Sequence, residues 1–153
     1  MVTVSIGSDD VYPVALYVLE ELKRRGYNVI IHGSLLTNKL EPWPDVAKDV
    51  ALDVARGEAS TGIVICYTGT GVSIAANKIK GIRAALCFDA QTARGARLWN
   101  DANVLALSGR ATSNQIAKEI LDEWFSVKQI DENERENINK IKKLEEKEIE
   151  ELV

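Results

Sequence analysis

The residues best suited to chemistry lie between positions 63 and 78, where an apolar run ends in a cysteine and a glycine-bearing loop follows. Cys66 ends the run, and Gly69 and Gly71 flank Thr70. We expect the thiol at the carboxyl end of a buried strand, where open parallel sheets bind their ligands. The amides that open the next helix favour an anion and lower the pKa of a nearby thiol. The segment therefore predicts a reactive thiolate beside a cradle for an oxyanion.

These residue types suit the removal of a proton from a carbon next to a carbonyl group. A thiolate at Cys66 would act as the general base, and the resulting enediolate would carry its charge on oxygen. Backbone N–H groups of residues 69–72 would hold that charge without reorganising. Thr68 would relay a proton between neighbouring oxygens. Asp9, which with Asp10 follows the first predicted strand, would orient a hydroxyl group or help to open a sugar ring.

Each candidate also has a structural explanation. A cysteine that ends a buried strand, such as Cys66 or Cys87, is usually a small apolar filler. The two glycines alone would mark a tight turn. The dinucleotide fingerprint fails because Ile74 stands where its third glycine belongs, and no Gly-Lys-Ser/Thr ending completes a nucleotide P-loop. Asp9 and Asp10 could simply cap the first helix.

The remaining charged candidates have simple default roles. His32 is the only histidine, lies in a strand pattern and is expected to be structural. Arg94, Arg97 and Arg110 would by default be solvated surface charges.

The composition is that of one globular domain. The 153 residues are 46% hydrophobic and 27% charged, which is sufficient for a real core. A net charge of −4 gives no general attraction to nucleic acid or membrane surfaces. The two cysteines have no metal-ligand spacing and are too few for a disulfide framework. No apolar run approaches the roughly 20 residues that span a bilayer. We expect a soluble protein in the reducing cytoplasm.

Strand and helix patterns alternate five times along the chain. The predicted strands are residues 2–6, 28–32, 62–66, 82–87 and 103–107, and the predicted helices cover about 14–24, 44–54, 72 onward, 90–99 and 113–125. Such alternation implies right-handed crossovers and a parallel sheet covered on both faces. We predict a single domain, residues 1–153, with a three-layer, doubly wound, Rossmann-like or flavodoxin-like five-stranded sheet. In a 2-1-3 strand order, the loops after residues 6 and 66 face each other.

The last segment, residues 131–153, differs from the rest in composition. It is rich in Glu, Lys and Asn, and its apolar residues recur at a three-to-four spacing: Ile138, Ile141, Leu144, Ile149 and Leu152. Asp131 and Glu134 resemble a capping box. We predict one long amphipathic helix with a narrow apolar stripe. It either lies across its own domain or extends to a second subunit.

The assembled motifs resemble those of the family of type B ribose-5-phosphate isomerases and galactose-6-phosphate isomerases. The resemblance covers the chain to about Phe125. It rests on Ile6-Gly7-Ser8-Asp9, Pro44-Asp45, Gly57-Glu58-Ala59, the long motif from Cys66 to Lys78, Gly81-Ile82-Arg83-Ala84-Ala85, residues 100–106 and Gly109-Arg110.

The resemblance implies an aldose–ketose isomerase without metal or cofactor, in which the residue matching Cys66 moves a proton between C1 and C2. The residue matching Thr68 assists, the loop 69–71 stabilises the enediolate, and Asp9 contacts substrate. Members are homodimers or homotetramers that share sites between subunits, so the resemblance favours a tail that reaches a partner. The substrate-binding residues predicted here are Asp10, Trp43, Tyr67, Gly69, Thr70, Gly71, Ser73, Trp99, Asn100, Arg110, Asn133 and Asn137.

Several of these positions depart from the family pattern. Asp10 and Trp99 stand where histidines are usual, the second of which is assigned to ring opening, and Trp43 replaces a tyrosine. Asn133 and Asn137 align with two arginines that grip the substrate phosphate, whereas Arg135 lies close to them and Arg110 is kept. The loss of two charge-assisted hydrogen bonds would remove ~3 kcal/mol of phosphate binding.

Three interpretations follow from these departures. The substrate is an unphosphorylated or differently shaped sugar that stacks on Trp43 and Trp99. Alternatively, it is a short or branched sugar phosphate that is gripped by Arg110 and Arg135 and needs no ring opening. As a third possibility, the chain is a non-catalytic partner subunit in a hetero-oligomer. We predict an active isomerase of the ribose 5-phosphate/ribulose 5-phosphate type with Cys66 as base. The partner subunit is the alternative, and a nucleotide-binding regulatory module is disfavoured by the failed phosphate-loop patterns.

Overall fold

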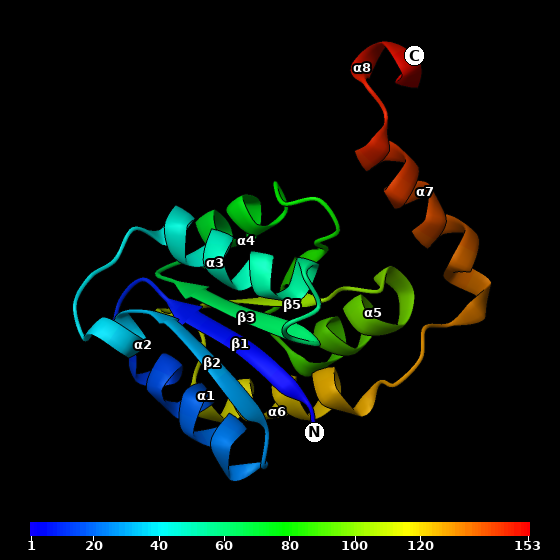
Figure 1. Cartoon of the computed structure of the whole chain (residues 1–153). Coiled ribbons are helices and arrows are strands. Elements are labelled where there is room, and N and C mark those ends of the chain that lie inside the picture. Colours follow the sequence, from blue (N-terminus) through cyan, green and yellow to red (C-terminus); the bar gives the residue numbers. More distant parts are fainter.

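The computed structural model describes all residues, 1–153, and forms a three-layer α/β sandwich with a projecting tail (Figure 1). Five parallel strands make the central sheet in the order β2-β1-β3-β5-β4: β1 (Thr3–Ser8), β2 (Asn28–Gly33), β3 (Thr61–Cys66), β4 (Ala84–Leu86) and β5 (Val104–Ser108). The predicted doubly wound parallel sheet and its 2-1-3 order are confirmed. The fourth strand is shorter than predicted, because Ile82 belongs to a turn in which its N–H donates to the Ile79 carbonyl.

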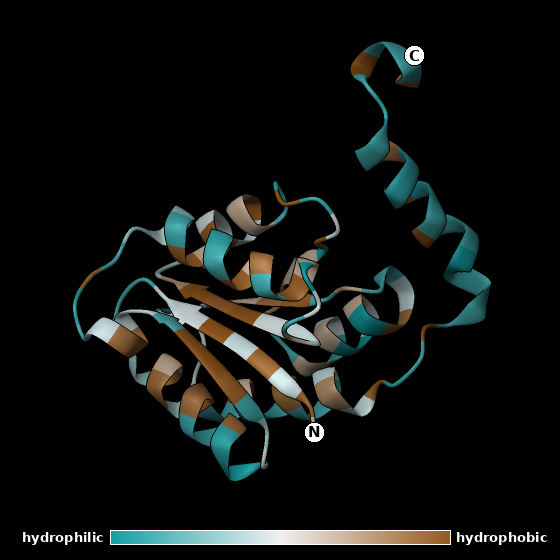
Figure 2. Cartoon of the chain, in the orientation of Figure 1, coloured by the Kyte–Doolittle hydropathy of each residue, from teal (hydrophilic) through white to brown (hydrophobic).

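Helices cover both faces of the sheet (Figure 1). The helices α1 (Pro13–Arg24), α5 (Ala90–Asn100) and α6 (Asn114–Ser126) pack on one face, and α3 (Trp43–Ala55) and α4 (Thr70–Ala76) pack on the other. A short helix, α2 (Ser34–Thr37), follows β2. Strands β3 and β5 are buried along their whole length, as strands between two helical layers must be. The apolar residues of β3 are brown in Figure 2. Because both strands are held between the two helical layers, the side chains at their carboxyl ends have fixed positions at the edge of the sheet.

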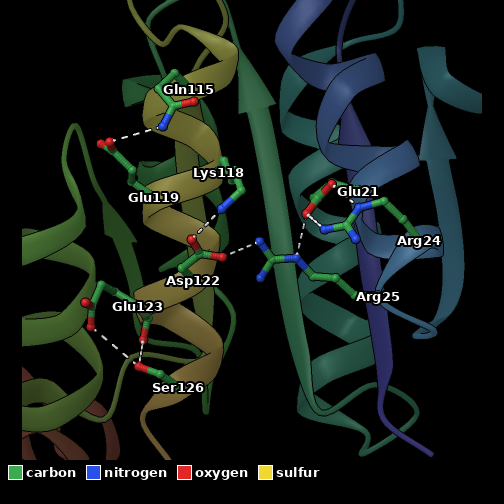
Figure 3. A network of polar contacts seen from close by, with 9 residues as sticks. All are labelled: Glu21, Arg24, Arg25, Gln115, Lys118, Glu119, Asp122, Glu123 and Ser126. Carbon is green, nitrogen blue, oxygen red and sulfur yellow. Dashed lines mark hydrogen bonds and ion pairs between the residues drawn. The ribbon is translucent and has the colours of Figure 1, made fainter.

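An ion-pair network links the first helix to the last helix of the sandwich (Figure 3). Glu21 on α1 is buried and accepts hydrogen bonds from both Arg24 and Arg25. Arg25 also donates to Asp122 on α6, at 2.6 Å, and Lys118 pairs with the same carboxylate. Because Arg24 holds Glu21 by two hydrogen bonds, the pKa of Glu21 falls to about 2. The network therefore holds α1 against α6 while Glu21 stays ionised.

The sequence predicts structural roles for His32 and for the Asp9–Asp10 pair, and only the first prediction is confirmed. His32 contacts Asp53 at 2.7 Å, and Ser5 donates to the same carboxylate oxygen, so His32 is structural as predicted. Asp9 and Asp10 do not cap α1. That helix begins at Pro13, and Tyr12 at its N-cap makes no side-chain capping bond.

The tail is not the single long helix that the sequence predicts. It consists of a short 3-10 helix (Glu132–Glu134), α7 (Arg135–Glu146) and α8 (Ile149–Leu152). The chain is extended at Glu148, whose side chain forms a capping box with Glu151 and so starts a new helix. No side chain of α7 or α8 is buried, so packing does not oppose this local break. Asp131 caps the 3-10 helix, whereas the Glu134 carboxylate accepts from Asn137 rather than closing a box.

The tail also projects away from the sandwich rather than lying across it (Figure 1). Its ribbon is mostly hydrophilic with separate apolar bands (Figure 2). Two hydrogen bonds join it to the body, one from the Gly81 N–H to Glu145 at 2.7 Å and one from the Asp131 N–H to the Leu98 carbonyl at 2.8 Å. No helix in the chain is long and apolar enough to cross a membrane.

Candidate active site

The candidate site lies where the chain leaves β1 and β3, at the carboxyl edge of the sheet. These two strands are neighbours, with Ser8 opposite Ile65, and their crossovers run to opposite sides of the sheet. Such a switch point leaves a crevice between the two following loops. A cavity of about 250 Å³ opens there, lined by Asp9, Trp43, Cys66, Tyr67, Thr68, Thr70 and Gly71. All seven are among the residues predicted from the sequence.

Cys66 lies in the wall of this cavity as the last residue of β3. It is 5% exposed, and it packs with Val64, Val72 and Ala106 in the apolar cluster beneath α3 and α4 while lining the cavity. Cys87, the other cysteine, is fully buried in the core between the sheet and α1, α5 and α6, where burial raises the pKa of its thiol to about 12. The two thiols are thus distinguished by position. Cys66 faces a cavity, whereas Cys87 is the small core residue that its sequence pattern predicts.

The loop after Cys66 turns sharply because of Gly69. This residue has φ of +81°, in the left-handed region, and a Cβ placed there would lie 2.9 Å from the backbone carbonyl carbon of Leu107. Only glycine fits both the conformation and the space. The turn brings the hydroxyl groups of Thr68 and Thr70 within 2.8 Å of each other. The predicted proton relay at Thr68 therefore has a second hydroxyl group beside it.

Backbone N–H groups are available beside these hydroxyl groups. The first amides of a helix have no intrahelical partner, and the N–H groups of Gly71 and Val72 make no hydrogen bond within the chain. The Thr70 N–H makes a long contact of 3.4 Å to the Thr68 hydroxyl oxygen. Trp43 covers Gly71, where an added Cβ would lie 3.0 Å from the indole ring. The loop thus offers donors under an aromatic wall.

Asp9 supplies the carboxylate of the cavity. Its backbone is fixed at both ends, since its N–H donates to Ile65 and its carbonyl accepts from Glu41. Its side chain accepts a hydrogen bond of 2.8 Å from the Tyr12 hydroxyl. Burial raises the pKa of Asp9, and the negative charge of Asp10 adds to the increase, whereas the Tyr12 hydrogen bond lowers it.

Three further predicted residues, Arg110, Asp10 and Ser73, lie near the cavity in the chain but do not line it. The Arg110 guanidinium lies 5.5 Å from the centre of the Tyr67 ring and pairs with no carboxylate in the chain. Asp10 does not line the cavity: its carboxylate accepts from the Val11 N–H. Ser73 lies in α4, one turn beyond Gly69. The Ser73 N–H donates a hydrogen bond to the Gly69 carbonyl.

Four predicted residues lie elsewhere: Trp99, Asn100, Asn133 and Asn137 do not line this cavity. Trp99 and Asn100 end α5, and the Trp99 ring folds back over Gly95. Asn100 lines a separate cavity of about 530 Å³ between the loop before β4 and α7. Asn133 and Asn137 are on the tail, which is joined to α5 by a hydrogen bond from the Asp131 N–H to Leu98. Arg135 is held by two hydrogen bonds to Glu132.

One residue beside the cavity is absent from the predicted set. Tyr12 contacts Asp9 three positions earlier in the chain, and its ring centre lies 6.4 Å from that of Tyr67. The residue before Pro13 is held extended, but the sequence carries no signal for the contact of the Tyr12 hydroxyl group with Asp9.

The fold, the cavity and the similarity to known proteins together define the class of the protein, a sugar-phosphate isomerase of the aldose–ketose type. A family model described as "Ribose/Galactose Isomerase" matches residues 4–144. The chain belongs to this family, as the sequence motifs indicated.

Known relatives agree with this assignment over most of the chain. The galactose-6-phosphate isomerase subunit LacB of Clostridium acetobutylicum is 39% identical over 90% of this chain and 79% of its own. Ribose-5-phosphate isomerase B of Escherichia coli is 40% identical over 82% of this chain and 84% of its own.

Solved structures agree equally well. Ribose-5-phosphate isomerase B of Clostridium thermocellum superposes with a TM-score of 0.85 at 40% identity, covering 94% of this chain and 97% of the other. The same enzyme of Mycoplasma genitalium, solved with bound ribulose 5-phosphate, gives a TM-score of 0.86 at 33% identity, covering 95% and 97%.

Proposed function

We propose that the protein interconverts an aldose phosphate and a ketose phosphate of the ribose 5-phosphate/ribulose 5-phosphate type, with Cys66 as the general base. The observation that carries this proposal is the single cavity of about 250 Å³ that brings the Cys66 thiol together with Asp9, Thr68 and Thr70. The Mycoplasma genitalium relative with bound ribulose 5-phosphate supports the choice of a pentose phosphate.

In the proposed reaction, the Cys66 thiolate removes a proton from C2 of the open-chain aldose or from C1 of the ketose. The electron pair of the broken C–H bond forms the C1–C2 double bond, and the carbonyl oxygen becomes an enediolate oxygen. The free N–H groups of Gly71 and Val72 would stabilise this charge. Thr68, with Thr70 beside it, would move a proton between O1 and O2. Return of the proton from Cys66 to the other carbon completes the isomerisation, with no net oxidation.

We infer that each site is completed by a second copy of the chain in a homodimer or homotetramer. Trp99, Asn100, Asn133 and Asn137 lie outside the Cys66 cavity, which leaves them free to serve a partner's cavity. The tail that carries two of them exposes apolar side chains, including Leu144 at 59% and Ile149 at 76%. An assembly in which a second copy covers the tail would remove these apolar side chains from water.

The substrate is tested with a panel of four-, five- and six-carbon aldose and ketose phosphates and the matching free sugars. We expect deuterium uptake from D₂O at C1 or C2 with a pentose phosphate, and none with the Cys66→Ala variant. The Cys87→Ala variant is the matched control and should keep full activity. Exchange at the wild-type rate in Cys66→Ala would contradict the assignment of the base.

Shared sites are tested by mixing two inactive variants, Cys66→Ala and Asn100→Ala, after reversible dissociation. If Asn100 serves the partner's cavity, half of the randomly formed dimers are mixed, and each mixed dimer has one intact site of two, so about a quarter of wild-type activity returns. If Asn100 serves its own cavity, no mixture regains activity.

A second candidate is a subunit of a hetero-oligomeric sugar-phosphate isomerase. It is favoured by the likeness to the LacB subunit and by the neutral Asn133 and Asn137 on the tail. This alternative predicts that the isolated chain catalyses no exchange into any sugar on the panel and becomes active only when a related chain is added.

A further inference from the structure

Tyr12 occupies a fixed position at the border of the candidate site. Its hydroxyl group donates to Asp9 Oδ1 at 2.8 Å. Its ring packs against Gly109, where an added Cβ would lie 2.5 Å from the ring, and its centre is 6.4 Å from that of Tyr67. Pro13 follows it and starts α1. The ring is therefore held from two sides, and the direction of its hydroxyl group is set by packing rather than by the hydrogen bond alone.

No side chain donates to the second carboxylate oxygen of Asp9. Oδ1 accepts from Tyr12, which is the only side chain that donates to this carboxylate, and the nearby backbone N–H groups of Asp9 and Asp10 also lower its pKa. The residue lines the cavity that contains Cys66 and is 8% exposed. Because its backbone is also bound on both sides, the carboxylate has little freedom to turn. One oxygen is thus fixed, and the other is available to a bound molecule.

Several ionisable groups surround the hydrogen-bonded pair of Tyr12 and Asp9, and one of them, Asp10, affects the pKa of Asp9. The other ionisable groups nearby are Asp10 in the same loop, Cys66 and Tyr67 at the end of β3, Arg110 beyond the Tyr67 ring, and Glu41, whose N–H donates to the Asp9 carbonyl. Burial and Asp10 both raise the pKa of Asp9, and Tyr12 opposes them. Burial likewise raises the pKa of the Tyr12 phenol, so it remains a protonated donor.

We propose that Tyr12 is a positioning residue for Asp9: its hydroxyl group fixes one carboxylate oxygen and leaves the other to accept a hydrogen bond from a sugar hydroxyl. The proposal rests on the isomerase function proposed above. Tyr12 itself does not line the cavity, so it acts through Asp9 rather than by touching the substrate.

The test is the Tyr12→Phe variant, which keeps the ring packing and removes only the hydroxyl group. We expect kcat/KM to fall roughly 10- to 100-fold, the worth of one hydrogen bond to a charged group. Loss of the donor raises the pKa of Asp9, so the acid limb of the kcat/KM profile moves to higher pH. The matched control is Tyr17→Phe, on α1 and packed against the core without a side-chain hydrogen bond, which should leave the profile in place. A purely structural role for Tyr12 would lower the melting temperature but would not move the acid limb.

Two further measurements test the proposal even if the Tyr12→Phe variant folds poorly or the chain has no activity without a second type of subunit. Replacement of Tyr12 by 3,5-difluorotyrosine strengthens the donor and should move the acid limb to lower pH. Titration of the Asp9 carboxyl carbon by ¹³C NMR reads its pKa without any substrate, and it should be higher in Tyr12→Phe than in the wild type. An unchanged Asp9 pKa overturns the proposal. A raised pKa in a chain that isomerises nothing on the panel would support the Tyr12–Asp9 coupling and reject the proposed function.

Discussion

Gly69 allows the geometry of the candidate site to be tested against a matched position. Gly69 and Gly57 have nearly the same backbone angle, φ of +81° and +78°. A Cβ at Gly57 would meet nothing within 4 Å, whereas a Cβ at Gly69 would lie 2.9 Å from the Leu107 carbonyl carbon and 2.6 Å from Leu86 Cδ1. The two glycines therefore differ in surroundings but not in conformation. Gly57→Ala measures the cost of the angle alone.

The structure sets the expected size of both effects. The left-handed conformation costs an alanine roughly 1 to 2 kcal/mol, which we expect for Gly57→Ala. The Leu86 methyl group can move aside in Gly69→Ala, but the Leu107 backbone belongs to β5 and cannot. We therefore expect a further loss of about 1 to 3 kcal/mol from overpacking. The loop will yield before the strand does, so the N–H groups of Gly71 and Val72 should shift by up to about 1 Å, which typically costs about 100-fold in rate.

The assay pairs urea unfolding with the steady-state kinetics of the substrate identified by the panel. Gly57→Ala should lose stability and keep kcat/KM, whereas Gly69→Ala should lose more stability and most of its kcat. If Gly69→Ala matched Gly57→Ala in both stability and kcat/KM, the loop would not be held against β5 as described. If it lost stability but kept kcat, the loop amides would have no part in the reaction.

Three further predictions concern the rest of the molecule. Iodoacetamide should alkylate Cys66 and inactivate the enzyme while Cys87 stays unlabelled, because burial raises the pKa of Cys87 to about 12 and leaves almost no thiolate at neutral pH; mass spectrometry of the labelled peptides checks this. Glu21→Gln should lose about 1 to 2 kcal/mol of unfolding free energy at neutral pH. The folded-state pKa of Glu21 is depressed from 4.5 to about 2, so the ionised carboxylate stabilises the folded protein fully above pH 4.5 and loses this effect as the pH falls toward 2. The urea midpoints of the wild type and the variant should therefore converge over that range. The exposed Glu20→Gln is the neutral control. Trp124→Phe should cost about 1 to 3 kcal/mol, because the buried Trp124 indole N–H donates to the Thr61 hydroxyl oxygen at 3.0 Å and that oxygen would lose its donor; an unchanged thermal midpoint would contradict this.

The neutral tail residues bear on the choice of substrate. Asn133 and Asn137 carry no charge, and Arg135 is already paired with Glu132. Arg110 is thus the one free cation among the residues predicted to bind substrate, and it lies beside the Cys66 cavity. A phosphate held mainly by Arg110 would bind weakly compared with one held by several charge-assisted hydrogen bonds. The substrate panel therefore includes the free sugars beside their phosphates.

Local patterns in the chain were enough to specify the layers of the fold and one wall of the site. Short β-branched runs alternate with amphipathic helices along the chain. Each helix can connect two neighbouring strands by a crossover, and such connections give a parallel sheet. The motif from Cys66 to Gly71 places its chemistry through backbone conformation, since Gly69 must turn where it does. Residue type and short-range spacing encode such features, so the amino-acid sequence predicts them directly.

Which of the candidates meet depended instead on the packing of distant segments. Asp9 and Cys66 are far apart in sequence and share a cavity because β1 and β3 are neighbours, whereas Asn100 and Asn137 lie at another edge of the molecule. Tyr12 joined the site through a contact that no spacing rule predicts. The tail breaks at Glu148 because no surface of the chain buries its apolar residues there. Most of the stability of a helix in a protein comes from such packing, which the sequence of the tail does not reveal.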